Sequence, residues 1–239
     1  MLWATIVMLF LFNSFRTQGV DPRLLASSSV VEVTDHPDFL SFTPKETTSQ
    51  TALLFFPGSG VATAAYAPLL HPIAEAGYPV FIVKLPWQFA PFSSHKQLAL
   101  DRARTIIETH PDITHWTAAG HSLGGALTSQ LAHTDSQRLT SIVLIGTTHP
   151  KQLNLSSLTI PVSKVYATND GVAPAERVKA NAHLLPPTTE WIEITGGNHS
   201  QFGHYGHQLF DGSPTLSREY QQSLTRDVLL KRLQVASPP

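Results

Sequence analysis

The fold of this chain is most constrained by the regular alternation of short apolar segments with longer segments of helical periodicity. Runs of β-branched, aromatic and aliphatic residues predict buried strands, and apolar residues at helical spacing predict helices between them. Strands joined by single helices favour a mostly parallel sheet with helices on both faces, and therefore an α/β protein. We expect strands at residues 29–33, 39–42, 52–56, 79–84, 114–119, 141–145, 162–167 and 190–194, and helices at 64–76, at 94–110 with Ser94 as its cap, at 125–132, after Pro174, and at 216–233 with Leu216, Tyr220, Leu224 and Val228 on one side.

Composition excludes several classes of protein. The chain has 239 residues, 42% of them hydrophobic and 14% charged, which is enough for one domain with a buried core. Its formal net charge of -1 offers no basic excess for a nucleic-acid backbone, so we expect no nucleic-acid partner. The sequence has no cysteine, which excludes disulfides, thiolate catalysis and cysteine-based metal sites.

The first residues resemble a leader segment. Residues 2–12 are apolar, but a membrane-spanning helix needs about 20 such residues. No Lys or Arg precedes the run, Arg16 follows it, and no clear A-x-A cleavage site comes before Val20. We expect residues 1–22 to be a signal peptide or membrane anchor, residues 28–236 to be the folded domain, and the protein to be exported or anchored at the cell envelope. The alternative is a buried N-terminal helix of a cytoplasmic protein.

Residues 120–124 read Gly-His-Ser-Leu-Gly, which fits the pattern G-x-S-x-G of a nucleophile elbow. In an elbow, the serine occupies a sharp turn between a strand and a helix, so that its hydroxyl is exposed at the edge of the sheet. A predicted strand precedes this motif, and a predicted helix with small residues in its first turn follows it. The pattern is short enough to occur by chance, but its position favours Ser122 as a catalytic nucleophile.

Two polar residues that could complete a catalytic triad follow later strands. Asp170 and His199 each come just after a predicted strand, in the chain order Ser, Asp, His. A serine hydroxyl needs a base to accept its proton, so His199 would be the base and Asp170 would orient it. Each could instead be a turn or surface residue, and Asn169 and Glu176 are nearby alternatives for the acid.

A tetrahedral intermediate also needs two N–H donors aimed at its oxyanion. One is expected from Leu123, the residue after the nucleophile. The second is expected from Ser59, with Gly58 as the fallback, because residues 57–60 form a glycine-rich turn after the third predicted strand. These glycines could also serve the turn alone.

Aromatic residues follow the fourth predicted strand on the same edge of the sheet. Trp87, Phe89 and Phe92 are expected to line the substrate pocket, together with Phe202 beyond the histidine. As an alternative, such side chains plug the core beside the sheet. About sixteen residues separate the strand ending at 145 from the strand beginning at 162, too few for a cap domain, so we expect an open site.

Several segments match a known family: Pro57-Gly58, 120–125, Asn169-Asp170-Gly171 and 196–203, with Tyr205-Gly206 and Asp211-Gly212 beyond them. With these segments the chain resembles the group of bacterial α/β-hydrolases that includes dienelactone hydrolases and small carboxylesterases, over about residues 50–230. This resemblance implies an α/β-hydrolase fold with a Ser-His-Asp triad, little or no lid, and in many members an export signal or anchor. Dienelactone hydrolases use a cysteine nucleophile, which this chain lacks, so their chemistry is not implied.

Together these features predict a serine hydrolase that cleaves carboxylic esters of short or medium acyl chain through an acyl-enzyme, with no cofactor and no metal. Its expected partner is a small-molecule ester. The alternatives are an acyltransferase or perhydrolase with the same triad, a non-catalytic binding module of this fold, and a metal site formed by His199, His204 and His207. Asn154 and Asn198 begin N-x-S sequons, and a glycan on Asn198 would obstruct the site.

Overall fold

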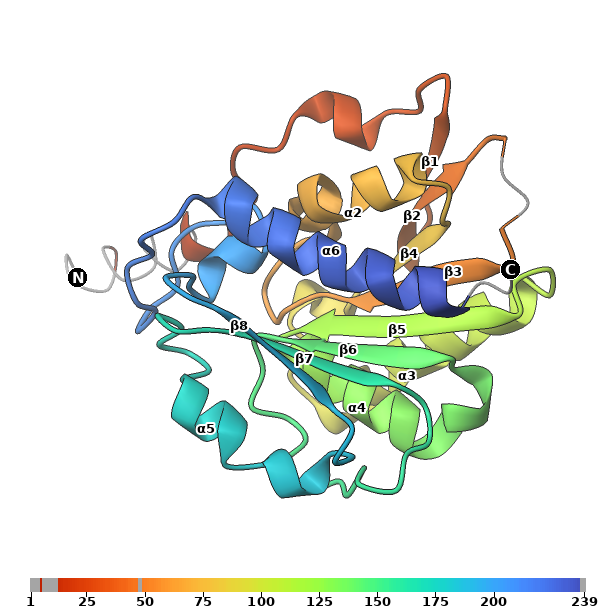
Figure 1. Cartoon of the computed structure of the whole chain (residues 1–239). Helices are drawn as coiled ribbons and strands as arrows, with labels where there is room; N and C mark the ends of the chain where they lie inside the picture. The colour runs from red at the N-terminus through yellow and green to blue at the C-terminus, as the bar shows by residue number, and fades with distance from the viewer. Residues whose placement is uncertain (1–4, 6–12, 47–48, 237–239) are drawn as a thin grey trace.

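The computed structural model describes residues 5, 13–46 and 49–236, so residues 1–4 and 6–12 of the expected leader lie outside the described residues. Its centre is one eight-stranded sheet in the order β1-β2-β4-β3-β5-β6-β7-β8 (Figure 1). The strands are β1 (Val31–Asp35), β2 (Phe39–Pro44), β3 (Thr51–Phe56), β4 (Val80–Val83), β5 (His115–His121), β6 (Ser141–Ile145), β7 (Val162–Ala167) and β8 (Glu190–Ile194). The helices are α2 (Ala67–Glu75), α3 (Ser93–Thr109), α4 (Leu123–Asp135), α5 (Ala175–Lys179) and α6 (Arg218–Ala236), with 3-10 turns at Pro22–Leu25, Thr63–Tyr66, Pro86–Gln88, Ser136–Arg138, Ala182–Leu184 and Ser200–Phe202.

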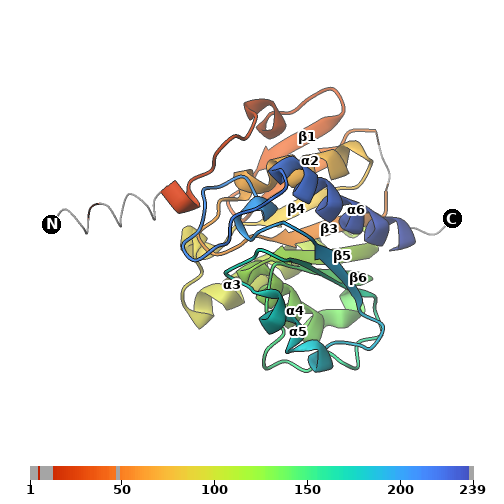
Figure 2. The same cartoon turned by 60° about the vertical axis from the view of Figure 1, so that its left-hand side comes forward.

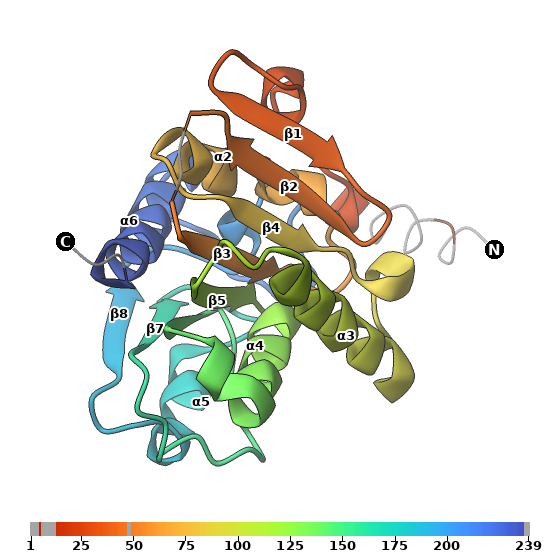
Figure 3. The same ribbon diagram turned by 90° about the vertical axis from the view of Figure 1, so that its right-hand side faces the viewer.

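The sheet is mostly parallel. β2 pairs antiparallel with both β1 and β4, and every pairing from β4 across to β8 is parallel. Helices α2 and α6 cover one face, and α3, α4 and α5 cover the other, as Figures 1 and 3 show from two sides. The prediction of an α/β fold with a mostly parallel sheet and helices on both faces is confirmed.

The central strands are buried along their whole length because helices cover both faces of the sheet. Every residue of β3 and β6 is buried. Leu53 and Phe55 pack in the core layer beneath α2 and α6, whereas Leu54 and Phe56 pack in the layer beneath α3 and α4. Burying each such side chain stabilises the fold by about 1.5–3 kcal/mol, so the sheet is a rigid base for the loops at its carboxyl edge.

Helix α3 begins at Ser93, so its N-cap lies two residues before the predicted cap, Ser94. Its N-cap position is Phe92, which has extended backbone, and no side chain caps the first turn. Ser94 therefore lies inside the helix, and the prediction that it caps the helix is wrong. Two serines stand side by side here, and sequence alone does not fix a helix boundary to one residue.

Helix α6 begins at Arg218, so Leu216 precedes the helix rather than opening it. Tyr220, expected on the buried side, is 57% exposed. The side that faces the domain carries buried Gln221 and Leu229 among other residues. The expected apolar stripe is wrong at Tyr220, because the first turn of α6 makes polar contacts with a loop. Leu216 lies outside the helix but still packs against the core, as expected.

The carboxyl edge of the sheet is open between β6 and β7. The structure describes the whole connection between these strands and places no helix or strand in it, so no cap domain is inserted there. Across residues 13–46 and 49–236, together with residue 5, no helix combines the length and the apolar character that crossing a membrane requires.

The segment before the sheet packs against the rest of the domain. Ser14 is buried, Thr17 forms an isolated β-bridge with Tyr205, and the N–H of Gln18 donates to the carbonyl oxygen of His204 at 2.8 Å. Figure 2 shows this red segment beside the loops at one end of the sheet. Residues 13–18 are therefore attached to the loop that follows β8.

Candidate active site

Ser122 lies at the sharp turn between β5 and α4, with φ 55° and ψ -115°. Positive φ strains a residue that has a Cβ, and such strain is common at active sites. The two glycines of the motif permit the turn. A Cβ on Gly120 would lie 2.2 Å from the carbonyl oxygen of Gly124, and a Cβ on Gly124 would lie 2.0 Å from that of Phe56. The turn presents Ser122 at the carboxyl edge of the sheet.

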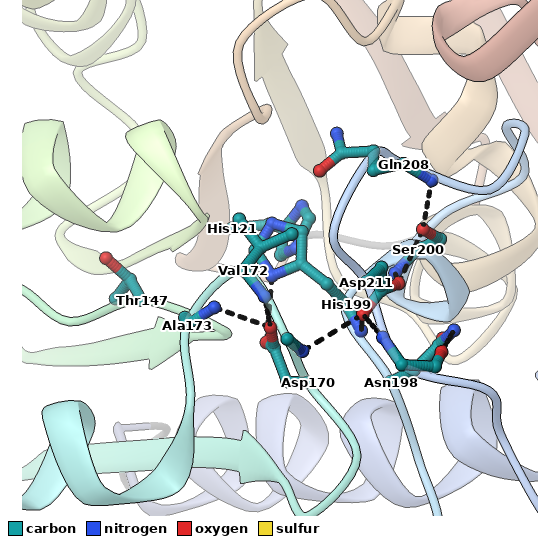
Figure 4. Close-up of polar contacts among 12 residues, drawn as sticks. His121, Thr147, Asp170, Val172, Ala173, Asn198, His199, Ser200, Gln208 and Asp211 are labelled. Carbon is teal, nitrogen blue, oxygen red and sulfur yellow. Dashed lines mark hydrogen bonds and ion pairs between the residues drawn. The ribbon is translucent and has the colours of Figure 1, made fainter. Parts of the chain in front are cut away.

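Asp170 and His199 come together from the loops after β7 and β8 (Figure 4). Nδ1 of His199 and Oδ2 of Asp170 are 2.8 Å apart, and both side chains are almost fully buried. Oδ1 of Asp170 accepts the N–H groups of Val172 and Ala173 at 2.9 and 2.6 Å, which fixes the carboxylate. Asn169, the neutral alternative, instead donates its side-chain N–H to the backbone of a later loop. Asp170 therefore orients the imidazole.

Ser122 and His199 both line one small cavity of about 150 Å³ at the carboxyl edge. Nε2 of His199 is buried and has no hydrogen-bond partner among the described residues. The nitrogen that would accept a proton from a serine is thus unoccupied, while Nδ1 is engaged by the carboxylate. The other lining residues are Leu123, Gly146, Thr147, Thr148, His149, Val172 and Ala173.

A buried lysine lies behind one wall of this cavity. Lys164 of β7 is 1% exposed, and its ammonium group donates to the carbonyl oxygen of His149. Burial lowers the pKa of Lys164 to about 7. Burial and nearby lysines lower the pKa of His149 to about 4. His149 is therefore uncharged at neutral pH.

The loop that carries His199 is held by the carboxylate of Asp211 (Figure 4). Oδ1 of Asp211 accepts the N–H groups of His199, Gly171 and Gly212 at 3.1, 3.3 and 2.9 Å. Oδ2 accepts the N–H and the hydroxyl of Ser200 at 2.8 and 2.7 Å. Gly171 directly follows Asp170, so the carboxylate of Asp211 ties the loop that carries His199 (the histidine loop) to the loop that carries Asp170 (the acid loop).

Asn198 and Gln221 hold the same loop from the other side. Gln221 of α6 accepts the N–H of Asn198 at 3.0 Å and donates to its carbonyl oxygen at 2.7 Å. The side chain of Asn198 donates to the carbonyl oxygen of Gly212 at 2.8 Å and accepts the N–H of Gln201 at 3.0 Å. Asn198 is only 1% exposed, so a glycan on this sequon is incompatible with the folded loop.

A buried tyrosine and histidine support the loop after β3. The hydroxyl of Tyr66 accepts the N–H of Gly58 at 2.9 Å and lies 2.8 Å from Nδ1 of His121. Burial raises the pKa of Tyr66. Burial and the neighbouring His199, whose ring centre is 4.5 Å away, lower the pKa of His121. Both groups are uncharged at neutral pH, so the tyrosine hydroxyl donates to the imidazole nitrogen.

These contacts bear on the expected oxyanion donors. A Cβ on Gly58 would lie 3.5 Å from Cβ of Ser122, so the loop after β3 lies directly against the candidate nucleophile. Because the N–H of Gly58 is engaged by a tyrosine, Ser59 is the better candidate of the two. Leu123 opens α4, where the first N–H groups have no acceptor within the helix.

The four expected pocket aromatics lie in different surroundings. Trp87, Phe89 and Phe92 are 81%, 43% and 65% exposed, and they are not among the residues that line the 150 Å³ cavity. Phe202 is fully buried in the core, with its ring against Gly146. The structure therefore places Phe202 behind the site and the other three on the surface.

The histidines considered as metal ligands are engaged elsewhere. His204 is largely buried, and its imidazole packs against the N-terminal segment, where a Cβ on Gly19 would lie 3.6 Å from Nδ1. His207 is exposed, with Nε2 3.1 Å from the carbonyl oxygen of Asp211. Within the part of the chain that the structure describes, no three His, Cys, Asp or Glu side chains are arranged to hold a metal ion.

The alpha/beta hydrolase family model matches residues 52–223, which is most of the chain. The chain therefore belongs to the alpha/beta hydrolase family, in agreement with its sheet order and with the resemblance seen in its sequence.

Two cutinases are similar to this chain. Cutinase 1 of Thermobifida cellulosilytica is 29% identical over 168 residues, covering 65% of this chain and 63% of its own length. A cutinase of Thermobifida fusca (strain YX) is also 29% identical over 168 residues, covering 65% of this chain and 54% of its own length. The chain thus matches less than two thirds of either relative.

Among solved structures, a ferulic acid esterase from Streptomyces cinnamoneus superposes with a TM-score of 0.67. Its sequence is 17% identical, and the match covers 81% of this chain and 69% of that chain. At this identity the likeness shows the fold, and the chemistry has to be argued from the site.

Proposed function

We propose that this protein is a serine hydrolase that cleaves carboxylic esters through an acyl-enzyme intermediate. The observation that carries the proposal is the buried 2.8 Å contact between His199 and Asp170, with Nε2 of the histidine unoccupied beside the cavity that Ser122 also lines. Membership of the alpha/beta hydrolase family and similarity to two cutinases support it.

In the acylation step, Oγ of Ser122 attacks the carbonyl carbon of the ester while its proton passes to Nε2 of His199. Asp170 stabilises the imidazolium that forms. The N–H groups of Ser59 and Leu123 donate to the oxyanion of the tetrahedral intermediate. When this intermediate collapses, the bond to the alcohol oxygen breaks and His199 returns the proton to the leaving alkoxide.

Deacylation repeats the same proton transfers with water. His199 takes a proton from water as the water oxygen attacks the acyl carbon, and the proton then passes to Oγ of Ser122 as the acid leaves. Every proton that the histidine accepts is returned within the cycle. The proposed chemistry therefore needs only groups of the chain and water.

The size of the cavity favours a compact acyl group. A volume of about 150 Å³ is small beside the 300–1,000 Å³ that is usual for drug-sized ligands. We expect short acyl chains to be turned over best, with the remainder of the substrate outside the cavity. Trp87, Phe89 and Phe92 are then candidates to contact that remainder.

We also propose that residues 1–22 direct the protein to the cell envelope and stay attached as an anchor. Residues 13–18 are held by a buried Ser14 and by backbone contacts to the loop after β8. Cleavage near residue 20 would remove a segment that the fold uses. This packing favours an anchor over a cleaved signal peptide.

A fluorophosphonate probe tests the nucleophile. We expect the wild-type protein to be labelled, Ser122→Ala to remain unlabelled, and Ser157→Ala, at an exposed surface serine, to be labelled like the wild type. Turnover of p-nitrophenyl esters from acetate to palmitate is expected to be highest for the short chains.

The outcomes separate the alternatives. A folded wild-type protein that takes no label would contradict the hydrolase and favour the non-catalytic binding module. Labelling combined with faster transfer to an added alcohol than to water would identify an acyltransferase that uses the same residues.

A further inference from the structure

The loop between β4 and α3 exposes large apolar rings in a strained backbone. We call residues 85–92 the aromatic loop. Trp87 is 81% exposed and Phe92 is 65% exposed. Trp87, Gln88 and Ala90 have φ of 54°, 62° and 44°, a region that residues with a Cβ rarely occupy. Strain of this kind persists where the surroundings enforce it, and it is common at functional sites.

The aromatic loop is bonded to the loop that carries the proposed oxyanion donor. The hydroxyl of Ser59 donates to the carbonyl oxygen of Phe89 at 2.9 Å, and the N–H of Gly60 donates to that of Gln88 at 2.9 Å. The exposed rings are therefore fixed directly beside the catalytic centre.

A second strained loop exposes apolar side chains beside the acid loop of the active site. Phe210 is 82% exposed with φ 69°, and Leu209 is 51% exposed. The carbonyl oxygen of Phe210 packs against Gly171, where a Cβ would meet it at 2.0 Å. Val172, the next residue, is 38% exposed and lines the cavity. Exposed apolar side chains thus lie beside both the loop after β3, which carries Ser59, and the acid loop, which carries Asp170.

The N-terminal segment joins the domain at this same place. The ring of Phe15 meets that of Phe89 edge to face, with centres 5.4 Å apart. Arg16 is exposed next to it. In Figure 2 the red turn that carries these residues lies beside the yellow loop before α3. The apolar run at residues 2–12 therefore connects to the domain at the edge where the active site opens.

We propose that the carboxyl edge of the sheet docks on a lipid surface, so that the hydrolase acts on esters presented by a lipid layer. Exposed apolar patches mark interaction surfaces, and aromatic rings favour the boundary between lipid and water. Stable attachment to lipid usually takes two signals, which here are the leader and the exposed rings, while Arg16 suits phosphate headgroups. The substrate class rests on the proposed function, but the docking geometry does not.

The position of Trp87 gives a direct test. The full-length chain with Ser122→Ala and Trp3→Phe is mixed with phosphatidylcholine vesicles whose acyl chains carry bromine, which quenches tryptophans that enter the lipid. The other two tryptophans are poor reporters, since Trp116 is 2% exposed and Trp191 is half-buried. We expect quenching that disappears when Trp87→Phe is added. Bound protein without quenching would overturn the proposal, because the leader would then tether an edge that faces away from the lipid.

Partitioning into unlabelled vesicles provides the second readout. In the same background, Trp87→Ser and Phe210→Ser are each expected to weaken vesicle binding about tenfold. Val30→Ser, which removes a 54% exposed apolar side chain at the opposite edge of the sheet, should leave binding unchanged. Equal binding by all three variants would also overturn the proposal. Since Ser122 is absent throughout, failure of the ester chemistry would show only in the labelling experiment.

Discussion

Replacing Asp211 with asparagine tests whether one carboxylate positions the histidine loop. The carboxylate accepts five hydrogen bonds, three on Oδ1 and two on Oδ2. Asparagine offers one carbonyl oxygen, so its amide N–H₂ must face either the backbone donors of His199, Gly171 and Gly212 or the donors of Ser200. A hydrogen bond to a charged group contributes about 1.5–3 kcal/mol, and the hydroxyl of Ser200 can rotate to accept from the amide. We expect a loss of about 2–4 kcal/mol in the free energy of unfolding.

For a chain of this size, such a loss lowers Tm by about 10 °C. A shift of His199 of about 1 Å would lower kcat/KM about 100-fold, since catalysis depends on that geometry. Urea unfolding and p-nitrophenyl acetate turnover, both measured well below Tm, check the two effects, with Asp112→Asn at an exposed turn as the control. An Asp211→Asn enzyme with reduced stability but unchanged kcat/KM would refute the positioning role, and one with neither change would refute the network.

Three further outcomes are expected. Tyr66→Phe leaves the buried N–H of Gly58 without its partner, so we expect a loss of about 1–3 kcal/mol in urea unfolding and a lower kcat with little change in KM. Lys164 has a pKa of about 7 in the folded protein against 10.5 unfolded, so the unfolded chain binds more protons between these values, and stability should rise from pH 7 to pH 10 by up to about 1.4 kcal/mol per pH unit. Urea unfolding across that range should show this rise in the wild type and lose it in Lys164→Met; a rise that persists in the variant would assign it to other groups. Gly124→Ala would place a Cβ 2.0 Å from the carbonyl oxygen of Phe56, so we expect no soluble folded protein in size-exclusion chromatography, and a native elution profile would contradict the close packing of this turn.

The strands could be predicted where local sequence marks their ends. β6, β7 and β8 begin and end at the predicted residues, since apolar runs are bounded there by turn formers such as Gly146 and Pro161. The strand ends in turn locate Asp170 and His199, because parallel strands bring their carboxyl ends to one edge. Local pattern was therefore sufficient for the fold and for two residues of the candidate triad.

The supporting residues could not be predicted in the same way. Asp211 lies 40 residues from Gly171, and Tyr66 lies 55 residues from His121, so only the folded chain reveals these contacts. The sequence shows the Asp211-Gly212 motif, but it does not show that Asp211 holds the histidine loop. Phe202 shows the same limit, since apolar character alone does not separate a core side chain from a pocket wall.

The two hydrogen bonds between Gln221 and Asn198 bear on when the active site forms during synthesis of the chain. Ser122, Asp170 and His199 all precede α6 in the chain, yet the loop that carries His199 is held by Gln221, a side chain of α6. A growing chain from which only residues 1–217 have emerged thus contains all three residues of the candidate triad but lacks the helix that holds the loop of His199. We expect hydrolase activity to arise only after α6 has left the ribosome and packed against the sheet, so the cell's own esters are protected until then.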